Sequence, residues 1–143
     1  MAKLKLKIAT PERVVYENEV DEVICPTEMG EVGILPGHIP LVANLKAGEL
    51  RVVNDETAKN IFVAGGFLEV RPGNEVVILA DAAEHEEEID LQRAEEARER
   101  ARQAMAEKTL SEEEYAATAA ALEKSLARIQ FAKKRKYKDV GKT

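Results

Sequence analysis

The placement of glycine and proline divides this chain into two parts and limits what each part can fold into. From Asp81 onward neither residue occurs until Gly141, and alanine, glutamate and arginine dominate the sequence. Before Asp81, short apolar stretches alternate with turn residues such as Pro36-Gly37 and Pro72-Gly73. Glycine accepts positive φ angles and proline fixes φ near about −65°, so both interrupt regular structure. The sequence therefore predicts two modules with different secondary structure.

Residues 1–84 are predicted to form an all-β sandwich or barrel. Many short apolar runs separated by turn residues are typical of short strands and not of helices. A module of this size buries a small core, which argues against a large internal active-site cavity. The runs that we interpret as strands are Leu4–Ile8, Val20–Ile24, Leu41–Leu45, Leu50–Val53, Ile61–Val63, Phe67–Val70 and Val76–Leu79.

Residues 85–143 are predicted to form two helices. Asp90 is placed to cap the first, which we expect to run to about Lys108. Ser111 and Glu114 have the S-x-x-E spacing of a capping box for the second, expected to end near Lys136. The link between them is so short that the helices must be antiparallel neighbours. The fold class is therefore α+β, a β-sandwich followed by a two-helix hairpin.

The faces predicted to join the two helices are rich in alanine. Because alanine buries little area, at roughly 25 cal/mol per Å² such an interface contributes only a few kcal/mol. We expect a hairpin that docks weakly and that a ligand or a partner can displace. The predicted seam consists of Leu91, Ala94, Ala97, Ala101 and Met105 on the first helix and Tyr115, Ala119, Leu122, Leu126 and Ile129 on the second.

Charge and composition exclude several classes of protein. The formal net charge of −6 argues against general nucleic-acid binding, which requires lysine and arginine to neutralise phosphates. No stretch reaches the roughly 18 apolar residues of a membrane helix, so we expect no membrane insertion and a cytoplasmic location. The single cysteine, Cys25, cannot form an intramolecular disulfide and is interpreted as a buried apolar residue. The basic segment Lys133–Lys138 is interpreted as a solvated helix end, with anion binding as the alternative.

The usual catalytic and metal-binding motifs are absent from the sequence. Gly141-Lys142-Thr143 imitates the end of a phosphate-binding loop, but Lys136 stands where its first glycine belongs. The acidic segment Glu84–Asp90 offers carboxylates for a cation. We favour the alternative that these residues lie before and inside the first turn of a helix, where the helix dipole stabilises negative charge.

Three motifs resemble one protein family, in that family's order and over essentially the whole chain. Residues 30–41 read GEVGILPGHIPL, residues 64–70 read AGGFLEV, and residues 79–81 read LAD directly before the predicted hairpin. Together with Pro72-Gly73-Asn74, they resemble the ε subunit of bacterial F-type rotary ATP synthases.

The resemblance implies a non-catalytic, ten-stranded sandwich that attaches to the γ subunit and rests on the c-ring. Such a subunit is peripheral at the cytoplasmic face of the bacterial membrane and couples the flow of H⁺ or Na⁺ to ATP synthesis. Its c-ring-facing loop corresponds here to residues 31–38, although a histidine in the setting of His38, taken alone, is more often a packed structural residue. The loop residues are Glu31, Gly33, Pro36, Gly37 and His38.

The resemblance also implies that the hairpin regulates the enzyme. In the family it lies folded or extends into the α/β catalytic ring, where it inhibits ATP hydrolysis. The sequence IDLQRA at residues 89–94 is similar to the motif with which some members bind ATP, a regulatory ligand and not a required cofactor; its Mg²⁺ dependence is left open. The residues implied are Glu84, Ile89, Asp90, Arg93, Ala94, Arg100, Lys124 and Arg128.

Two features of the sequence allow these residues to be explained without an ATP site. Lys124 stands where ATP-binding members have arginine, which loses a bidentate grip on phosphate. Asp90 is also explained as a helix cap. Arg93 and Arg100 are also explained as ion-pair partners of surface glutamates such as Glu96. At the level of the whole protein, the competing functions are a free-standing nucleotide sensor and a small β-sandwich enzyme.

Overall fold

The computed structural model describes residues 2–106 and 110–141, with side chains described as far as residue 134. The chain forms two compact units, Met1–Glu86 and Glu87–Thr143. The boundary predicted from the sequence, after residue 84, lies close to this division.

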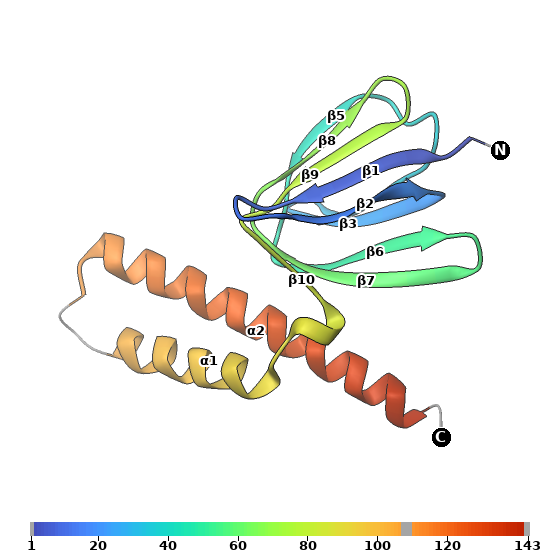
Figure 1. Cartoon of the computed structure of the whole chain (residues 1–143). Helices are drawn as coiled ribbons and strands as arrows, with labels where there is room; N and C mark the ends of the chain where they lie inside the picture. Colours follow the sequence, from blue (N-terminus) through green and yellow to red (C-terminus); the bar gives the residue numbers. More distant parts are fainter. Residues whose placement is uncertain (1, 107–109, 142–143) are drawn as a thin grey trace. The chain divides into compact units, whose positions relative to one another are not determined.

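The first unit consists of ten strands in two five-stranded sheets (Figure 1). One sheet has the order β2-β1-β9-β8-β5 and the other β10-β7-β6-β3-β4. The predicted α+β class and ten-stranded sandwich are therefore confirmed. The strands are β1 (Leu4–Ala9), β2 (Val14–Val20), β3 (Glu22–Thr27), β4 (Gly30–Ile34), β5 (Leu41–Asn44), β6 (Gly48–Asn54), β7 (Thr57–Ala64), β8 (Phe67–Arg71), β9 (Glu75–Leu79) and β10 (Ala82–His85).

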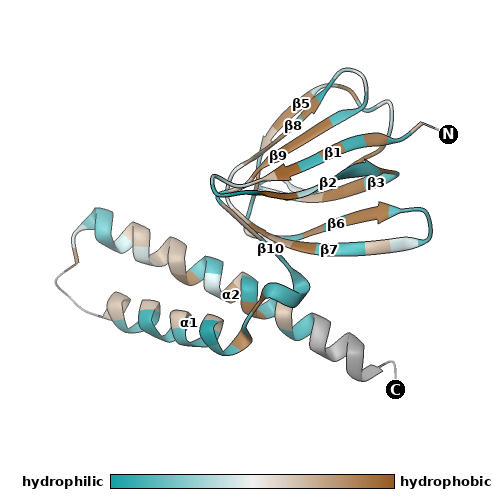
Figure 2. Ribbon diagram, in the orientation of Figure 1, coloured by the Kyte–Doolittle hydropathy of each residue, from teal (hydrophilic) through white to brown (hydrophobic). Residues whose placement is uncertain are grey.

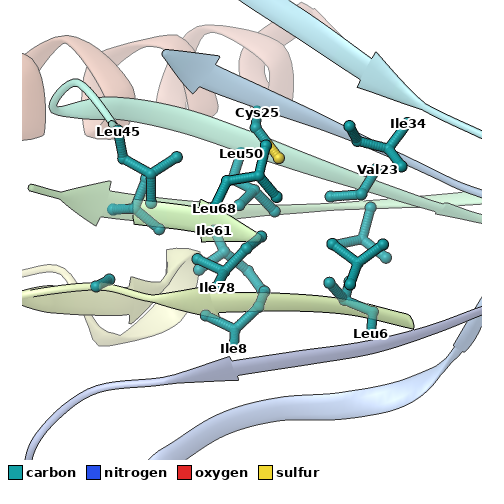
Figure 3. Close-up of a cluster of buried hydrophobic side chains, with 14 of the residues drawn as sticks. Leu6, Ile8, Val23, Cys25, Ile34, Leu45, Leu50, Ile61, Leu68 and Ile78 are labelled. Atoms are coloured by element: carbon teal, nitrogen blue, oxygen red, sulfur yellow. The ribbon is translucent and has the colours of Figure 1, made fainter. Parts of the chain in front are cut away.

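The two sheets enclose one apolar core. In several strands alternate residues point inward, as in β1, where Leu4, Leu6 and Ile8 are buried and the lysines between them are exposed. Figure 2 shows the same alternation of hydrophobic and hydrophilic residues along the strands. In Figure 3, side chains from both sheets interdigitate, among them Leu6, Ile8, Val23, Cys25, Leu50, Ile61, Leu68 and Ile78. Burial raises the pKa of the Cys25 thiol to about 12, so the thiol stays protonated near neutral pH.

Strand β1 connects β2 to the rest of the first sheet. β1 pairs in parallel with β9, from Lys5 opposite Glu75 to Ala9 opposite Leu79. On its other side β1 pairs antiparallel with β2. β1 therefore lies inside the sheet and joins two segments that are far apart in the sequence.

Three strands were not predicted. β2 carries the polar run Glu17-Asn18-Glu19 on an edge, so it lacks a regular apolar period. β4 contains two glycines and was interpreted as part of a loop. β10 was not interpreted as a strand because Ala-Ala-Glu is typical of a helix, although residues 82–84 fell within the predicted sandwich; it pairs antiparallel with β7, with Ala83 buried. In each case pairing with a neighbouring strand, which no local pattern shows, decides the structure.

The second unit is a pair of helices, α1 (Leu91–Ala106) and α2 (Glu112–Gly141), which run antiparallel side by side (Figure 1). A short 3₁₀ helix, η1 (Glu86–Glu88), precedes them at the boundary between the units. The predicted hairpin is confirmed, although α2 continues past Lys136 and the predicted end of the first helix near Lys108 lies outside the described residues. No helix in the described residues is long and apolar enough to cross a membrane.

Both predicted helix starts are confirmed by hydrogen bonds. Asp90 Oδ1 accepts a hydrogen bond from the Arg93 backbone N–H at 3.2 Å, and Ser111 Oγ accepts one from the Glu114 N–H at 3.1 Å. These bonds satisfy backbone donors that the first turn of a helix leaves without a partner. The expectation that Glu84–Asp90 lies before and inside a helical first turn is partly wrong: the segment precedes α1 and Asp90 caps it, but Glu84 lies in β10, Glu86–Glu88 form η1, and no acidic residue lies in the first turn of α1.

The predicted seam of the hairpin is partly wrong. On α1, Ala94 and Ala101 are buried as expected. On α2, Tyr115 and Leu126 are exposed, whereas Ser125 and Ile129 are buried. A serine is tolerated in this position because its Oγ donates to the Ala121 carbonyl at 2.9 Å, so no polar group is left without a partner.

The close approach of Gly66 to the end of β9 provides a test of the sandwich. A Cβ at Gly66 would overlap the Leu79 carbonyl oxygen and lie 2.7 Å from Ala80 Cα, whereas one at Gly73 meets nothing within 4 Å. Both glycines have positive φ, 99° and 83°. We expect Gly73→Ala to cost about 1 kcal/mol of unfolding free energy, from backbone strain alone, and Gly66→Ala about 3 kcal/mol or more. Urea unfolding measures both, and equal losses would contradict the backbone contact.

Candidate functional sites on the sandwich and the hairpin

The residues predicted to face the c-ring do not form a single loop. Glu31 and Gly33 belong to β4, an edge strand that pairs with β3 through Glu31 opposite Pro26 and Gly33 opposite Ile24. Pro36, Gly37 and His38 lie in the connection that follows. The expectation of one loop over residues 31–38 is therefore wrong. The strand forms because Val32 and Ile34 alternate with exposed residues and Ile34 enters the core.

The connection between β4 and β5 begins with a tight turn. The His38 N–H donates to the Leu35 carbonyl at 3.1 Å, and Gly37 has φ 87°. A proline in the second position and a glycine with positive φ in the third are typical of a type II turn. The turn presents apolar side chains to solvent, since Leu35 is 54% and Ile39 74% exposed. His38 is half-buried, and its Nδ1 lies 2.6 Å from the carbonyl oxygen of Ile39, which makes that nitrogen the donor.

The residues of the predicted ATP site fall into both units. Glu84 lies in β10 of the first unit, while the other predicted residues lie in the second. Ile89 and Asp90 follow η1, and Asp90 is exposed and caps α1. Ala94 is buried on α1. Within the second unit the set comprises two exposed cations, Arg93 and Arg100, and two half-buried cations, Lys124 and Arg128.

The four cations of the hairpin lie along one side of it. On each helix of the hairpin, some residues come directly before a buried residue of the shared seam. Because the two helices are right-handed and antiparallel, these residues point to the same side of the pair on both helices. All four cations occupy such positions. They are Arg93 before Ala94, Arg100 before Ala101, Lys124 before Ser125, and Arg128 before Ile129.

Three of these cations also lie at the same level along the hairpin. At about 1.5 Å per residue, Arg93 lies about 20 Å from the end of α1, while Lys124 and Arg128 lie about 18 and 24 Å from the start of α2. Arg100 lies about 10 Å nearer to the link, two turns along α1. Arg93, Lys124 and Arg128 therefore lie at a similar level along the two helices.

The glutamates around these cations are engaged elsewhere. Glu96 accepts a hydrogen bond from Gln92 at 3.4 Å, and Glu99 forms an ion pair with Arg102 at 3.8 Å. Within the described residues, no ion pair engages Arg93 or Arg100. The pairing of Arg93 with Glu96, which was the alternative to ligand binding, is thus not formed in this part of the chain. The same residues contain no group of three or more acidic, histidine or cysteine side chains arranged to hold a metal ion.

Both units match known domains in sequence. Residues 3–86 match the beta-sandwich domain of the ATP synthase Delta/Epsilon chain, and residues 87–133 match its long alpha-helix domain.

The chain belongs to the ATP synthase delta/epsilon chain family.

Similar members of this family are bacterial proteins named ATP synthase epsilon chain. The protein of Dehalococcoides mccartyi is 48% identical over 136 residues, which is 95% of this chain and 96% of the relative. That of Carboxydothermus hydrogenoformans is 51% identical over 107 residues, covering 75% of this chain and 79% of the relative. The predicted relation to the ε subunits of bacterial ATP synthases is therefore confirmed.

Two chains in solved structures of mitochondrial ATP synthases have a similar fold. A chain of the Euglena gracilis mitochondrial ATP synthase, in a structure of OSCP, F1 and the c-ring, has a TM-score of 0.76 at 26% identity, covering 89% of this chain and 79% of that one. A chain of the Tetrahymena thermophila mitochondrial ATP synthase central stalk and c-ring has a TM-score of 0.61 at 14% identity, covering 92% and 97%.

Sequence reasoning missed Asn74 as a residue that connects the family motifs. It was quoted with the family motifs but given no role, whereas its Oδ1 accepts a hydrogen bond from the Gly37 N–H at 2.7 Å. The sequence offers one signal, an asparagine after Pro-Gly, a residue type that tolerates positive φ. Nothing local identifies its partner, 37 residues away.

Substitutions at Asp90 distinguish its structural role as a helix cap from a role in ligand binding. We expect Asp90→Ala to cost about 1 kcal/mol of helix stability, because the Arg93 N–H loses its acceptor, whereas Asp90→Ser keeps the cap and removes the charge. Amide exchange of residues 91–94 measures the effect, with the exposed neighbour Gln92→Ala as control. Exchange that is equally slow in the alanine and serine variants would contradict the capping role.

Proposed function

We propose that this chain is the ε subunit of the central stalk of a bacterial F-type ATP synthase and acts without catalysing a reaction itself. The observation that carries the proposal is the match to both family domains in order, with 48% identity over 136 residues to a bacterial epsilon chain. A subunit that works by docking needs a rigid anchoring domain and exposed contact surfaces. The closed core of the sandwich and its solvent-exposed apolar turn meet these requirements.

In the assembled enzyme, the sandwich binds the γ subunit and the c-ring at the cytoplasmic face of the membrane. The proposed c-ring contact comprises the outer edge of β4 and the turn after it, through Glu31, Gly33, Pro36, Gly37 and His38. Exposed apolar side chains beside these residues support a protein contact here, since Leu35, Ile39 and Val42 are 54%, 74% and 71% exposed.

Co-purification tests membership of the enzyme. When the chain is expressed with its own ATP synthase subunits, we expect it to co-purify with γ and the c-ring and to enter the complete enzyme in equal amount with γ. A solitary, stable protein that binds nucleotide would favour a free-standing sensor instead.

In the proposed mechanism, the hairpin regulates hydrolysis by leaving its folded state and extending into the α/β catalytic ring. The seam of the hairpin contains Ala94, Ala101, Ser125 and Ile129, with one large apolar side chain among them, so a competing partner needs only a few kcal/mol to replace it. The charged surface of the extended helices would contact the catalytic ring.

Deleting residues 87–143 tests this regulatory role. The sandwich ends as a compact unit at Glu86, so the shortened chain should still assemble with γ. We expect ATP hydrolysis by the isolated F1 part to rise several-fold, because the inhibitory segment is gone. Unchanged hydrolysis with normal assembly would remove inhibition from the proposed function.

In its folded state the hairpin is proposed to bind ATP as a regulatory ligand. Arg93, Lys124 and Arg128 lie at one level on one side of the helix pair, with Arg100 two turns away, so together they can neutralise a triphosphate. Ile89, Asp90 and Ala94 adjoin this group in the sequence, whereas Glu84 lies in the first unit and its part in the site stays a prediction from the resemblance. Bound nucleotide stabilises the folded hairpin by mass action and so opposes inhibition when ATP is abundant.

Calorimetric titration of the whole chain with ATP tests the site, with and without Mg²⁺. We expect saturable binding to be lost in the Arg93→Ala, Arg128→Ala double variant, because the phosphates lose two of their cations. Arg102→Ala is the matched control, since it removes an exposed cation of α1 outside the set. Lys124→Arg should tighten binding, because a planar guanidinium grips phosphate bidentately. Equal binding by the double variant and the control would exclude the site.

A further inference from the structure

Two Pro-Gly turns lie together at one end of the sandwich. The first is Leu35–His38, between β4 and β5, and the second is residues 71–74, between β8 and β9. Gly37 and Gly73 have nearly the same φ, 87° and 83°, and each follows a proline. Both therefore have the pattern of a type II turn, in which the N–H of the glycine takes no part in the hydrogen bond that closes the turn.

Asn74 joins these two turns to each other and to β1. Its Oδ1 accepts a hydrogen bond from the Gly37 N–H at 2.7 Å, and its backbone carbonyl accepts one from the Lys5 N–H at 2.7 Å. Its own φ is 61°, a left-handed conformation that asparagine adopts more readily than most residues. This conformation lets one residue hold β1 with its backbone and the Leu35–His38 turn with its side chain.

The Leu35–His38 turn has no comparable anchor of its own. In the part of the chain that the structure describes, its other hydrogen bonds are internal, from the His38 N–H to Leu35 and between His38 Nδ1 and Ile39. Leu35 and Ile39 are 54% and 74% exposed, so the core does not hold their side chains. The direction in which the turn presents them therefore depends on the bond to Asn74.

We propose that Asn74 is a positioning residue for the partner-facing turn: its Oδ1 holds Leu35, His38 and Ile39 in the orientation that docks on the c-ring. This inference rests on the proposed function for the identity of the partner. Asn74 itself belongs to the β8–β9 turn and acts on the docking surface through Gly37. Loss of one neutral hydrogen bond of this kind should lower the equilibrium ratio of held to released turn about five-fold.

Amide hydrogen exchange of the whole chain tests the hydrogen bond between Gly37 and Asn74, here called the tether, in the absence of any partner. Asn74→Gly keeps a residue that accepts positive φ but removes Oδ1, so we expect the Gly37 amide to exchange about five-fold faster. Asn74→Asp keeps an acceptor oxygen and should restore slow exchange. Asn18→Ala is the control, because Asn18 Oδ1 accepts only a local bond, from the Glu19 N–H at 2.9 Å, on the edge strand β2. Unchanged exchange at Gly37 in Asn74→Gly would overturn the tether.

Binding to the c-ring tests whether the tether positions the turn for docking. The chain in complex with γ is measured against detergent-solubilised, immobilised c-ring. We expect wild type and Asn74→Asp to bind alike and Asn74→Gly to bind about five-fold more weakly, mainly through faster dissociation. Equal binding by wild type and Asn74→Gly overturns the positioning role and leaves the c-ring contact standing. Absence of binding by the wild type overturns the c-ring contact itself, and the docking role of Asn74 with it.

Discussion

The parallel pairing of β1 with β9 is the interaction on which the rest of the sandwich depends. It places Leu4, Leu6 and Ile8 in the centre of one sheet, where they meet the apolar residues of the other. It also fixes the start of β9, so that Asn74 lies beside β1 and within reach of Gly37. Without this pair, β2 and β1 would separate from the rest of their sheet, and the turn that we propose to face the c-ring would lose its support.

The two units of the chain are stabilised in different ways, and this difference fits the two roles proposed for them. The sandwich buries large side chains between two sheets, which makes its surface geometry fixed. The hairpin buries two alanines, Ser125, Ile129 and Phe131, so it has far fewer large buried apolar side chains than the sandwich. A regulator needs two states of similar free energy, and a small interface provides them more easily than a large one. Nucleotide held by Arg93, Lys124 and Arg128 would then shift the balance between the two states.

Sequence reasoning predicted the elements whose local pattern agrees with their environment. The caps at Asp90 and Ser111 and the alternation in β1 were visible because one short segment contains the whole signal. The edge strand β4 was missed because its glycines resemble a loop, and β10 because its composition is helical, although both are determined by their neighbours. The same distinction applies to the sites. The cations of the hairpin were identifiable by spacing, whereas the contact of Asn74 with Gly37 arises only from the folded topology.

The parallel β1–β9 pair has a consequence for the order in which the protein forms during synthesis. β1 can pair with β2 as soon as both have been translated, but its other edge has no partner until residues 75–79 emerge. During that interval the edge is open to pairing with other nascent chains. Lys5 and Lys7, which look like ordinary surface residues in the finished sheet, alternate along this strand. Their charges would repel a second copy of the same strand, so they protect the nascent chain before they serve the folded one.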